Sequence, residues 1–201
     1  MAFLTTVAPD VASGVLAELY EQDQTTYGYV ANHTRALSLH PDAVAAFRAL
    51  ARAVKSRMEP RRFELVTVAA ARELHSTYCL LSHSTALRRL GAFDDQQLAA
   101  IATDHRQADL SPAEEAMLDY ATAVASDAPA ITAADIHSLR RHGFTDAEIL
   151  DVALAVALRC FYSTVLDAVG AQADPAYAEL NEALQAVLVV GRPIADARST
   201  P

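Results

Sequence analysis

Alanine is the residue that most constrains this chain, because it fills 43 of the 201 positions, whereas glycine fills only 6. Alanine has the highest helix propensity of all residues, and glycine has one of the lowest. Segments that alternate between apolar and polar residues, as half-buried strands do, are hard to find in the sequence. The sequence therefore predicts an all-α protein.

Local signals mark where the helices begin and end. Asp94, Ser111 and Thr145 are each followed three residues later by Glu or Gln, the pattern of a capping box at a helix start. A helix often ends at a glycine, because the residue after it adopts the left-handed conformation. Three glycines follow segments with a helical apolar period and predict helix ends: Gly91, Gly143 and Gly170. We expect helices at residues 10–23, 42–57, 60–73, 77–90, 94–103, 112–126, 133–142, 146–169 and 175–190. Residues 24–40 show no sustained period and predict a loop or a broken helix.

The length favours a single domain over residues 1–201, with residues 191–201 as a frayed tail. The helix expected at 146–169 is apolar nearly all round, so it must be covered on every side. Because this apolar surface is long for a domain of this size, we expect another copy of the chain to cover part of it. The sequence therefore predicts a homo-oligomer.

The charge balance limits the partners of the chain. With 25 acidic and 16 basic residues, the formal net charge is -9, which gives no attraction to nucleic acid or to anionic membranes. The amino terminus lacks a basic stretch followed by an apolar one, and no segment has about 18 uninterrupted apolar residues. We therefore expect a cytoplasmic protein that binds neither nucleic acid nor a membrane.

The two cysteines, Cys79 and Cys160, form neither a disulfide scaffold nor a four-ligand zinc site. The histidines show no repeated metal-ligand spacing with carboxylates. We therefore expect neither a metal nor a cofactor, and we interpret Cys160 as a core residue.

The candidate catalytic residues lie within residues 64–91. Cys79 and His83 are four positions apart and therefore share one face of a helix, where a nucleophile would lie beside a base. If Ser76 caps this helix, Cys79 falls in its first turn, where backbone amides and the helix dipole favour a thiolate. Ser76 could also donate a hydrogen bond to that thiolate.

Glu64 is the third candidate catalytic residue, because a helix-turn-helix joint near His75 would fold it back onto His83 as an orienting carboxylate. His75 lies beside this joint, where we expect an exposed turn residue; the alternative is that it adds a second imidazole to the pocket. Tyr78 could line the pocket mouth together with Tyr27, Tyr29 and His33, although aromatic residues in an alanine-rich bundle are often core residues. The alternative interpretation is structural. Cysteine often behaves as a small buried hydrophobe, a lone histidine is often a satisfied polar residue, and Glu64 then suits the first turn of its helix.

This stretch resembles the carboxymuconolactone decarboxylase and alkyl hydroperoxidase D family. The family signature is a Glu, eleven residues, a Cys-x-x-Cys and a His four residues after the second Cys, and it aligns with Glu64, Ser76, Cys79 and His83. The similarity extends over about residues 25–175 and includes ANHTRALSLHPDAVAAFRAL upstream and TDAEILDVALAV and FYSTVLDAVG downstream. The resemblance implies a helical bundle that assembles as a dimer, trimer or hexamer.

Ser76 is where the chain departs from the family, because it replaces the first cysteine of the pair and an internal disulfide cannot form. Either an external thiol resolves an oxidised Cys79, or the scaffold serves another reaction. Three functions therefore remain open. The first is a peroxidase-like enzyme in which Cys79 attacks a hydroperoxide, His83 moves protons and Glu64 holds His83. The second is an acid/base enzyme acting on a small lactone or carboxylate, and the third is a non-catalytic oligomeric binding protein.

Overall fold

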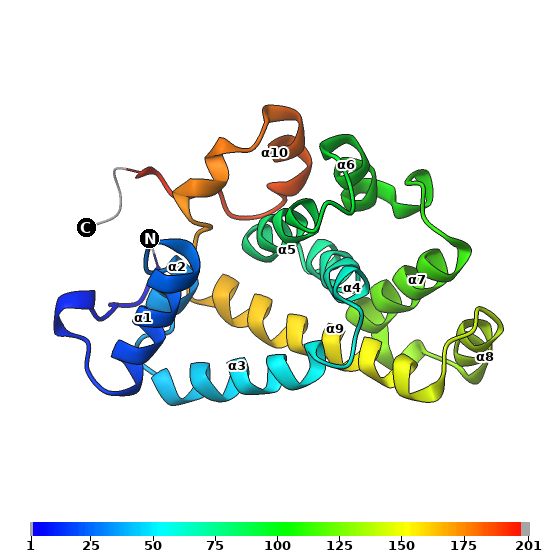
Figure 1. Ribbon diagram of the computed structural model, residues 1–201, viewed down its shortest axis with the longest axis horizontal. Coiled ribbons are helices and arrows are strands. Elements are labelled where there is room, and N and C mark those ends of the chain that lie inside the picture. The colour runs from blue at the N-terminus through cyan, green and yellow to red at the C-terminus, as the bar shows by residue number, and fades with distance from the viewer. Residues whose placement is uncertain (1, 198–201) are drawn as a thin grey trace.

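The computed structural model describes residues 2–197, and within this range it contains helices and no strand (Figure 1). The all-α prediction is confirmed. The α-helices are α1 (Val15–Tyr27), α2 (Asn32–Ala36), α3 (Pro41–Lys55), α4 (Pro60–Glu73), α5 (Thr77–Arg89), α6 (Asp95–Asp104), α7 (Pro112–Asp127), α8 (Ala133–Arg141), α9 (Asp146–Ala168) and α10 (Glu182–Leu188). Short 3-10 helices lie at Pro9–Val11, His105–Gln107, Ala128–Ala130 and Pro175–Glu179.

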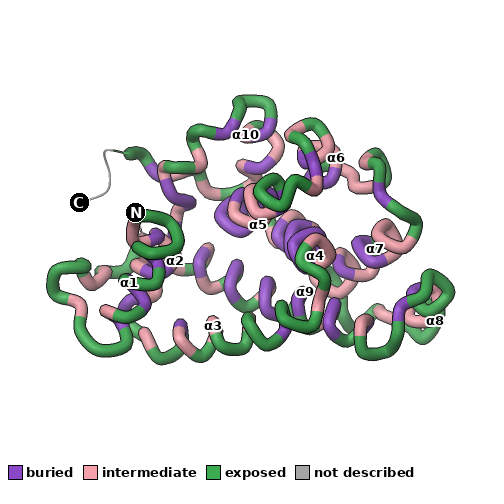
Figure 2. Tube along the Cα trace, in the orientation of Figure 1, coloured by how far each residue is buried: buried purple, intermediate pink, exposed green. Residues whose placement is uncertain are grey.

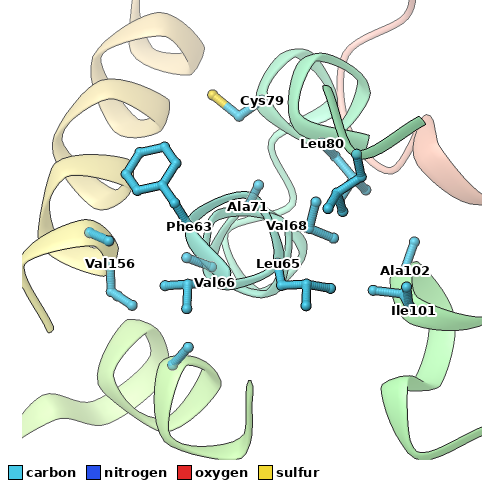
Figure 3. Close-up of a cluster of buried hydrophobic side chains, with 14 of the residues drawn as sticks. Phe63, Leu65, Val66, Val68, Ala71, Cys79, Leu80, Ile101, Ala102 and Val156 are labelled. Atoms are coloured by element: carbon cyan, nitrogen blue, oxygen red, sulfur yellow. The ribbon is translucent and has the colours of Figure 1, made fainter. Parts of the chain in front are cut away.

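Helix α4 forms the centre of the molecule and is buried nearly all round (Figure 2). It packs against α5, α7 and α9, and its side chains radiate into the core on several sides (Figure 3). Leu65, Val66, Ala70 and Ala71 are fully buried there. Because Glu64 lies on the same helix, its carboxylate is placed inside the protein, where it needs charged or hydrogen-bonded partners.

The helices from α3 to α9 begin and end within two residues of their predicted positions. The capping boxes at Asp94, Ser111 and Thr145 are formed, with the side-chain and backbone hydrogen bonds in both directions. A fourth capping box pairs Thr132 with Asp135. It was not predicted, because its third residue is Asp instead of the Glu or Gln of the usual pattern. These boundaries are set by local hydrogen bonds, so the sequence could predict them.

The first and last predicted helices differ from the structure. Helix α1 begins at Val15 rather than at residue 10, because Gly14 has a φ of 56° and interrupts the helix. It continues to Tyr27 and ends at Gly28 in the left-handed conformation, so the expected irregular segment starts later and contains α2. The helix expected at 175–190 is broken, because the Asn181 side chain accepts a hydrogen bond from the backbone of Leu184 and starts a new helix there.

The segment after α10 is anchored, and the prediction of a frayed tail is wrong for residues 191–197. The Gly191 amide donates to Thr77 Oγ1 at 2.8 Å, and the Ala195 amide donates to the Ala173 carbonyl at 2.9 Å. A Cβ atom on Gly191 would lie 2.4 Å from the His75 carbonyl oxygen, so only glycine fits at this approach. This segment therefore fixes the start of α5. Residues 198–201 lie outside the described range.

Helix α9 is the one helix within residues 2–197 that is long and apolar enough to cross a membrane. It packs against α3, α4 and α7, and 56% of its most apolar window is buried within the protein. This packing is that of a core helix and is compatible with a soluble protein. The cytoplasmic location stays a prediction.

The outer face of α9 remains apolar, which bears on the predicted homo-oligomer. Its exposed residues follow the alternating spacing of three and four that is typical of helix pairing, and they are Ala147, Leu150, Leu154, Ala157, Phe161, Thr164 and Ala168. Leu150, Leu154 and Phe161 are 58%, 40% and 52% exposed. Because a helix with this repeat can pair with its own copy, we expect a second copy of the chain to cover this face.

We therefore expect light scattering to show a particle larger than the 21.5 kDa monomer. Leu154→Glu should lower the measured mass to that of the monomer, because it places a charge in the middle of the paired face. Val11→Glu is the matched control, because Val11 is also exposed but lies outside α9. A wild-type particle of monomer mass at micromolar concentration would contradict the prediction.

Candidate functional site

A cavity of about 780 Å³ lies between α1, α3, α5 and α9. Cys79 and His83 reach it from α5, whereas Arg159 and Tyr162 reach it from α9. Phe47 and Phe63 contribute aromatic surface. A second cavity of about 770 Å³ shares Tyr27, Lys55, Ser82 and His83 with the first, so His83 lies between the two.

Glu64 holds His83 in this cavity. Helices α4 and α5 form a helix-turn-helix, which brings the Glu64 carboxylate within 2.5 Å of His83 Nδ1. The other carboxylate oxygen accepts a hydrogen bond from Lys55 Nζ at 2.6 Å. Burial alone would raise the pKa of Glu64, but the hydrogen bonds and positive charges of His83 and Lys55 outweigh it and lower the pKa to about 2. Glu64 is therefore ionised at neutral pH.

His83 is neutral at the same pH. Burial, followed by the positive charge of Arg159, lowers the pKa of His83 to about 4 against the opposing effect of Glu64. Because an ionised carboxylate can only accept, the single ring proton must lie on Nδ1 and point at Glu64. The Nε2 lone pair is then free to take up a proton in the cavity.

The sulfur of Cys79 faces a buried cation. Arg159 Nη1 donates a hydrogen bond to Cys79 Sγ at 3.0 Å, and the two residues are only 8% and 2% exposed. The sulfur points away from the hydrophobic cluster and towards α9 (Figure 3). Among residues 2–197, Arg159 forms no ion pair with a carboxylate, and its buried Nε has no hydrogen-bond partner. A buried charge is costly without a counter-charge, and a Cys79 thiolate would supply one.

The expected contacts of Cys79 are only partly present. His83 and Cys79 line the same cavity, but no hydrogen bond connects them within the described part of the chain. Ser76 occupies the N-cap position of α5, and Cys79 falls in the first turn of the helix as expected. The expectation that the Ser76 hydroxyl donates to the sulfur is wrong, because within residues 2–197 Arg159 is the donor to Cys79 Sγ. The Ser76 side chain makes no capping hydrogen bond and lies beside Asp167, where it opposes the effect of burial, which raises the pKa of that carboxyl group. Arg159 therefore takes the place that the sequence analysis gave to Ser76.

The other supporting residues divide between the cavity and the surface. His75 forms the turn between α4 and α5 with a φ of 53°, is exposed and lies outside the cavity, so it is the exposed turn residue that the sequence favoured and not a second imidazole in the pocket. Tyr78 does line the cavity, and its hydroxyl donates to Asp174 Oδ2 at 2.5 Å. Cys160 packs against the hydrophobic core and does not line the cavity.

The sequence analysis missed Arg159 and Tyr162. Arg159 is the one basic residue within the apolar helix α9, and a charge at a position that must be buried is a signal for a buried partner. Tyr162 lies one turn further on, and its hydroxyl is 2.8 Å from His33 Nδ1. The predicted pocket-mouth residues Tyr27 and His33 line the main cavity, whereas Tyr29 lines the second one.

Comparisons with known proteins agree with this architecture. Residues 40–123 match the model of the carboxymuconolactone decarboxylase family. A peroxidase-related protein with an alkylhydroperoxidase AhpD core, from Ralstonia eutropha JMP134, is 23% identical with a TM-score of 0.79, and the match covers 95% of this chain and 98% of that one. A peroxidase-related protein from Silicibacter sp. TM1040 is 25% identical with a TM-score of 0.76, covering 87% and 94% of the two chains.

The debrominase Bmp8, in a complex with 2,3,4-tribromopyrrole, has a similar fold at 16% identity, with a TM-score of 0.72 over 94% of this chain and 98% of its own. Among curated proteins, none matches this chain. The sequence match at residues 40–123 supports a relationship to the carboxymuconolactone decarboxylase family, and the similarity along nearly the whole chain shows that the protein has the AhpD-like fold.

Proposed function

We propose that the protein is a thiol-dependent peroxidase of the alkyl hydroperoxidase D type that uses Cys79 as its single reactive cysteine. The observation that carries the proposal is the hydrogen bond of 3.0 Å from the buried Arg159 guanidinium to Cys79 Sγ, since this guanidinium has no carboxylate partner in the described part of the chain. A guanidinium in this position favours the thiolate, which is the nucleophilic form of cysteine. A neutral histidine with a free Nε2 lines the same cavity and supplies a base.

The reaction proceeds in two stages. His83 Nε2 takes the proton from Cys79, and the thiolate attacks the terminal oxygen of a hydroperoxide ROOH. The O–O bond breaks, the alkoxide RO⁻ takes the proton back from His83, and Cys79 becomes a sulfenic acid. An external thiol then condenses with the sulfenic acid, releasing water and forming a mixed disulfide, and a second thiol releases Cys79 as a thiol.

The size of the cavity favours an organic hydroperoxide. Its volume of about 780 Å³ is far larger than hydrogen peroxide requires, and Phe47, Phe63 and Tyr162 supply aromatic surface for an organic group. The second cavity, which meets the first at His83, offers an external thiol a route towards the oxidised sulfur. An external thiol is needed because Ser76 holds the position of a resolving cysteine and Cys160 does not line the cavity.

Mass spectrometry tests this proposal. After treatment with one equivalent of cumene hydroperoxide, Cys79 should carry a sulfenic acid that a trapping reagent captures and that added thiol removes. Cys160→Ser is the matched control and should react like the wild type, whereas Cys79→Ser should not react. If Cys79 stays an unmodified thiol, and His83→Ala leaves its alkylation rate unchanged, then the peroxidase proposal fails.

A second candidate is acid/base catalysis on a small lactone or carboxylate, in which Cys79 only lines the pocket. The observation in its favour is that His83, which Glu64 orients, lines a cavity that also contains Arg52, Lys55 and Arg159, which would attract an anionic substrate. Cys79→Ser separates the two candidates. A variant that still turns over such a substrate supports acid/base catalysis and contradicts the peroxidase.

A further inference from the structure

Two histidines line the main cavity, and their side chains are held in the same manner. His83 Nδ1 contacts Glu64, and His33 Nδ1 contacts the hydroxyl groups of Tyr162 at 2.8 Å and of Thr34 at 3.1 Å. Within residues 2–197 neither Nε2 atom forms a hydrogen bond, and neither is fully buried, so both are accessible from the cavity. The chemistry of each histidine therefore depends on which nitrogen carries its proton.

The partners of His33 determine the position of its proton. Thr34 Oγ1 accepts a hydrogen bond from Arg48 Nη2 at 2.8 Å, so its own hydrogen is free to be donated. Within residues 2–197, His33 Nδ1 is the only hydrogen-bond acceptor that either the Thr34 or the Tyr162 hydroxyl contacts. A proton on Nδ1 would leave both hydroxyl hydrogens without an acceptor within residues 2–197, whereas the single lone pair there accepts one of them, and the Tyr162 hydroxyl is the closer donor. The network therefore places the His33 proton on Nε2, and burial lowers the pKa of His33 to about 4, so the ring is neutral.

The position of His33 is fixed by further contacts. Its backbone amide donates to the Tyr78 hydroxyl at 3.0 Å, which ties it to the helix that carries Cys79. Its ring packs against the rings of Tyr27, Tyr78 and Tyr162, with centroid distances of 6.2, 5.5 and 5.9 Å. Arg48, which orients Thr34, is held in turn by the buried Asp23 at 2.6 Å. A side chain held on so many sides is preorganised to present one atom to a ligand.

We propose that His33 is a second catalytic histidine, whose Nε2–H donates a hydrogen bond to the alkoxide oxygen of the hydroperoxide as the O–O bond breaks, while His83, in the opposite tautomer, acts as the base. The cavity then holds one imidazole that accepts a proton and one that donates a hydrogen bond. The role of His33 in the reaction rests on the proposed peroxidase function, whereas the assignment of the two tautomers does not.

The donor would act when the O–O bond breaks. Negative charge then develops on the alkoxide oxygen, and a fixed N–H group stabilises this charge more strongly in the transition state than in the bound substrate. His33 keeps its proton throughout, because the proton that finally neutralises the alkoxide comes from Cys79 by way of His83. Tyr162 and Thr34 act as positioning residues, since they hold the Nδ1 lone pair.

The tautomers can be tested without any substrate. In a ¹⁵N-labelled protein at pH 7, long-range proton-nitrogen correlation spectra should show a protonated Nε2 for His33 and a protonated Nδ1 for His83. The double variant Thr34→Val, Tyr162→Phe removes both hydroxyl groups and should shift the His33 ring towards a mixture of tautomers. A protonated Nδ1 on His33 in the wild type overturns the proposal.

The role in catalysis is tested by comparing two oxidants. A peroxycarboxylic acid releases a weakly basic carboxylate, which gains little from a hydrogen bond to its leaving oxygen. Cumene hydroperoxide releases a strongly basic alkoxide, which gains more from such a bond. His33→Leu should slow oxidation of Cys79 by cumene hydroperoxide at least about tenfold more than oxidation by peracetic acid. His33→Gln should restore most of the difference, because its amide offers an N–H donor in a similar position.

His40→Leu is the matched control, because His40 lines a different, apolar cavity, and the rates with both oxidants should be unchanged. An equal loss of rate with both oxidants in His33→Leu would show that His33 only supports the fold, and would overturn its catalytic role. If wild-type Cys79 reacts with neither oxidant, the peroxidase function itself fails, and the spectra still decide the tautomers.

Discussion

Replacing Arg159 with methionine is expected to slow the alkylation of Cys79 at neutral pH by about 10- to 100-fold. The guanidinium donates the only hydrogen bond that the sulfur receives within residues 2–197, and it is the nearest positive charge in the structure that can balance a thiolate. A hydrogen bond to a charged group contributes about 1.5–3 kcal/mol, and each 1.4 kcal/mol corresponds to a factor of ten.

Arg62→Met is the control for this experiment, because Arg62 also packs on an aromatic ring, that of Phe144, but lines neither of the two cavities at His83. Its alkylation profile should match that of the wild type. We also expect Arg159→Met to keep or increase the thermal stability, because methionine fills a similar volume without a buried charge. An unchanged rate profile in a folded Arg159→Met variant would show that Arg159 does not activate the sulfur.

The free energy of unfolding is expected to fall by about 4 kcal/mol between pH 7 and pH 4 because of His33 and His83. Both are neutral in the folded protein, where burial lowers their pKa from 6.5 to about 4. In the unfolded chain they take up protons as the pH drops below about 6.5, so acid favours the unfolded state. Each histidine should contribute on the order of 2 kcal/mol, and urea titrations at a series of pH values would measure the loss.

Glu64 adds a separate effect at lower pH. Its pKa is lowered from 4.5 to about 2, so its stabilisation is complete above pH 4.5 and is lost as the pH falls towards 2. His83→Gln should remove about half of the loss between pH 7 and pH 4. His105→Gln should leave the loss unchanged, because that side chain pairs with the half-exposed Asp119 in a site remote from the cavity. A free energy of unfolding that stays constant from pH 7 to pH 4 would contradict the prediction.

The sequence predicted the parts of the fold that short-range hydrogen bonds determine. The capping boxes at Asp94, Ser111 and Thr145 involve partners three residues apart, and the structure contains all three. The segment after α10 is different, because Gly191 and Ala195 bond to residues that are distant in the chain. Sequence periodicity carries no information about such a pairing. The sequence therefore predicted a frayed tail where residues 191–197 are held by hydrogen bonds.

The same distinction applies to the site. The pairing of Glu64 with His83 follows from two consecutive helices that fold back on each other, so their spacing indicated the contact. Arg159 is 80 residues away from Cys79 along the chain, and only the packing of α9 against the other helices brings it to the sulfur. Ser76 shows the converse, because it occupies the N-cap position of α5 without a capping side-chain hydrogen bond, and its hydroxyl group lies beside the partly exposed Asp167 on α9.

The contact between Gly191 and the start of α5 also bears on how the protein matures during synthesis. The hydrogen bond from the Gly191 amide to Thr77 Oγ1 spans 114 positions, and it is formed at the first residue of the helix that carries Cys79. A nascent chain that has not yet reached residue 191 already contains Glu64, Cys79, His83 and Arg159, but it lacks the segment that anchors this helix. The surroundings of Cys79 can therefore be completed only after residue 191 has been synthesised and has packed against the start of α5.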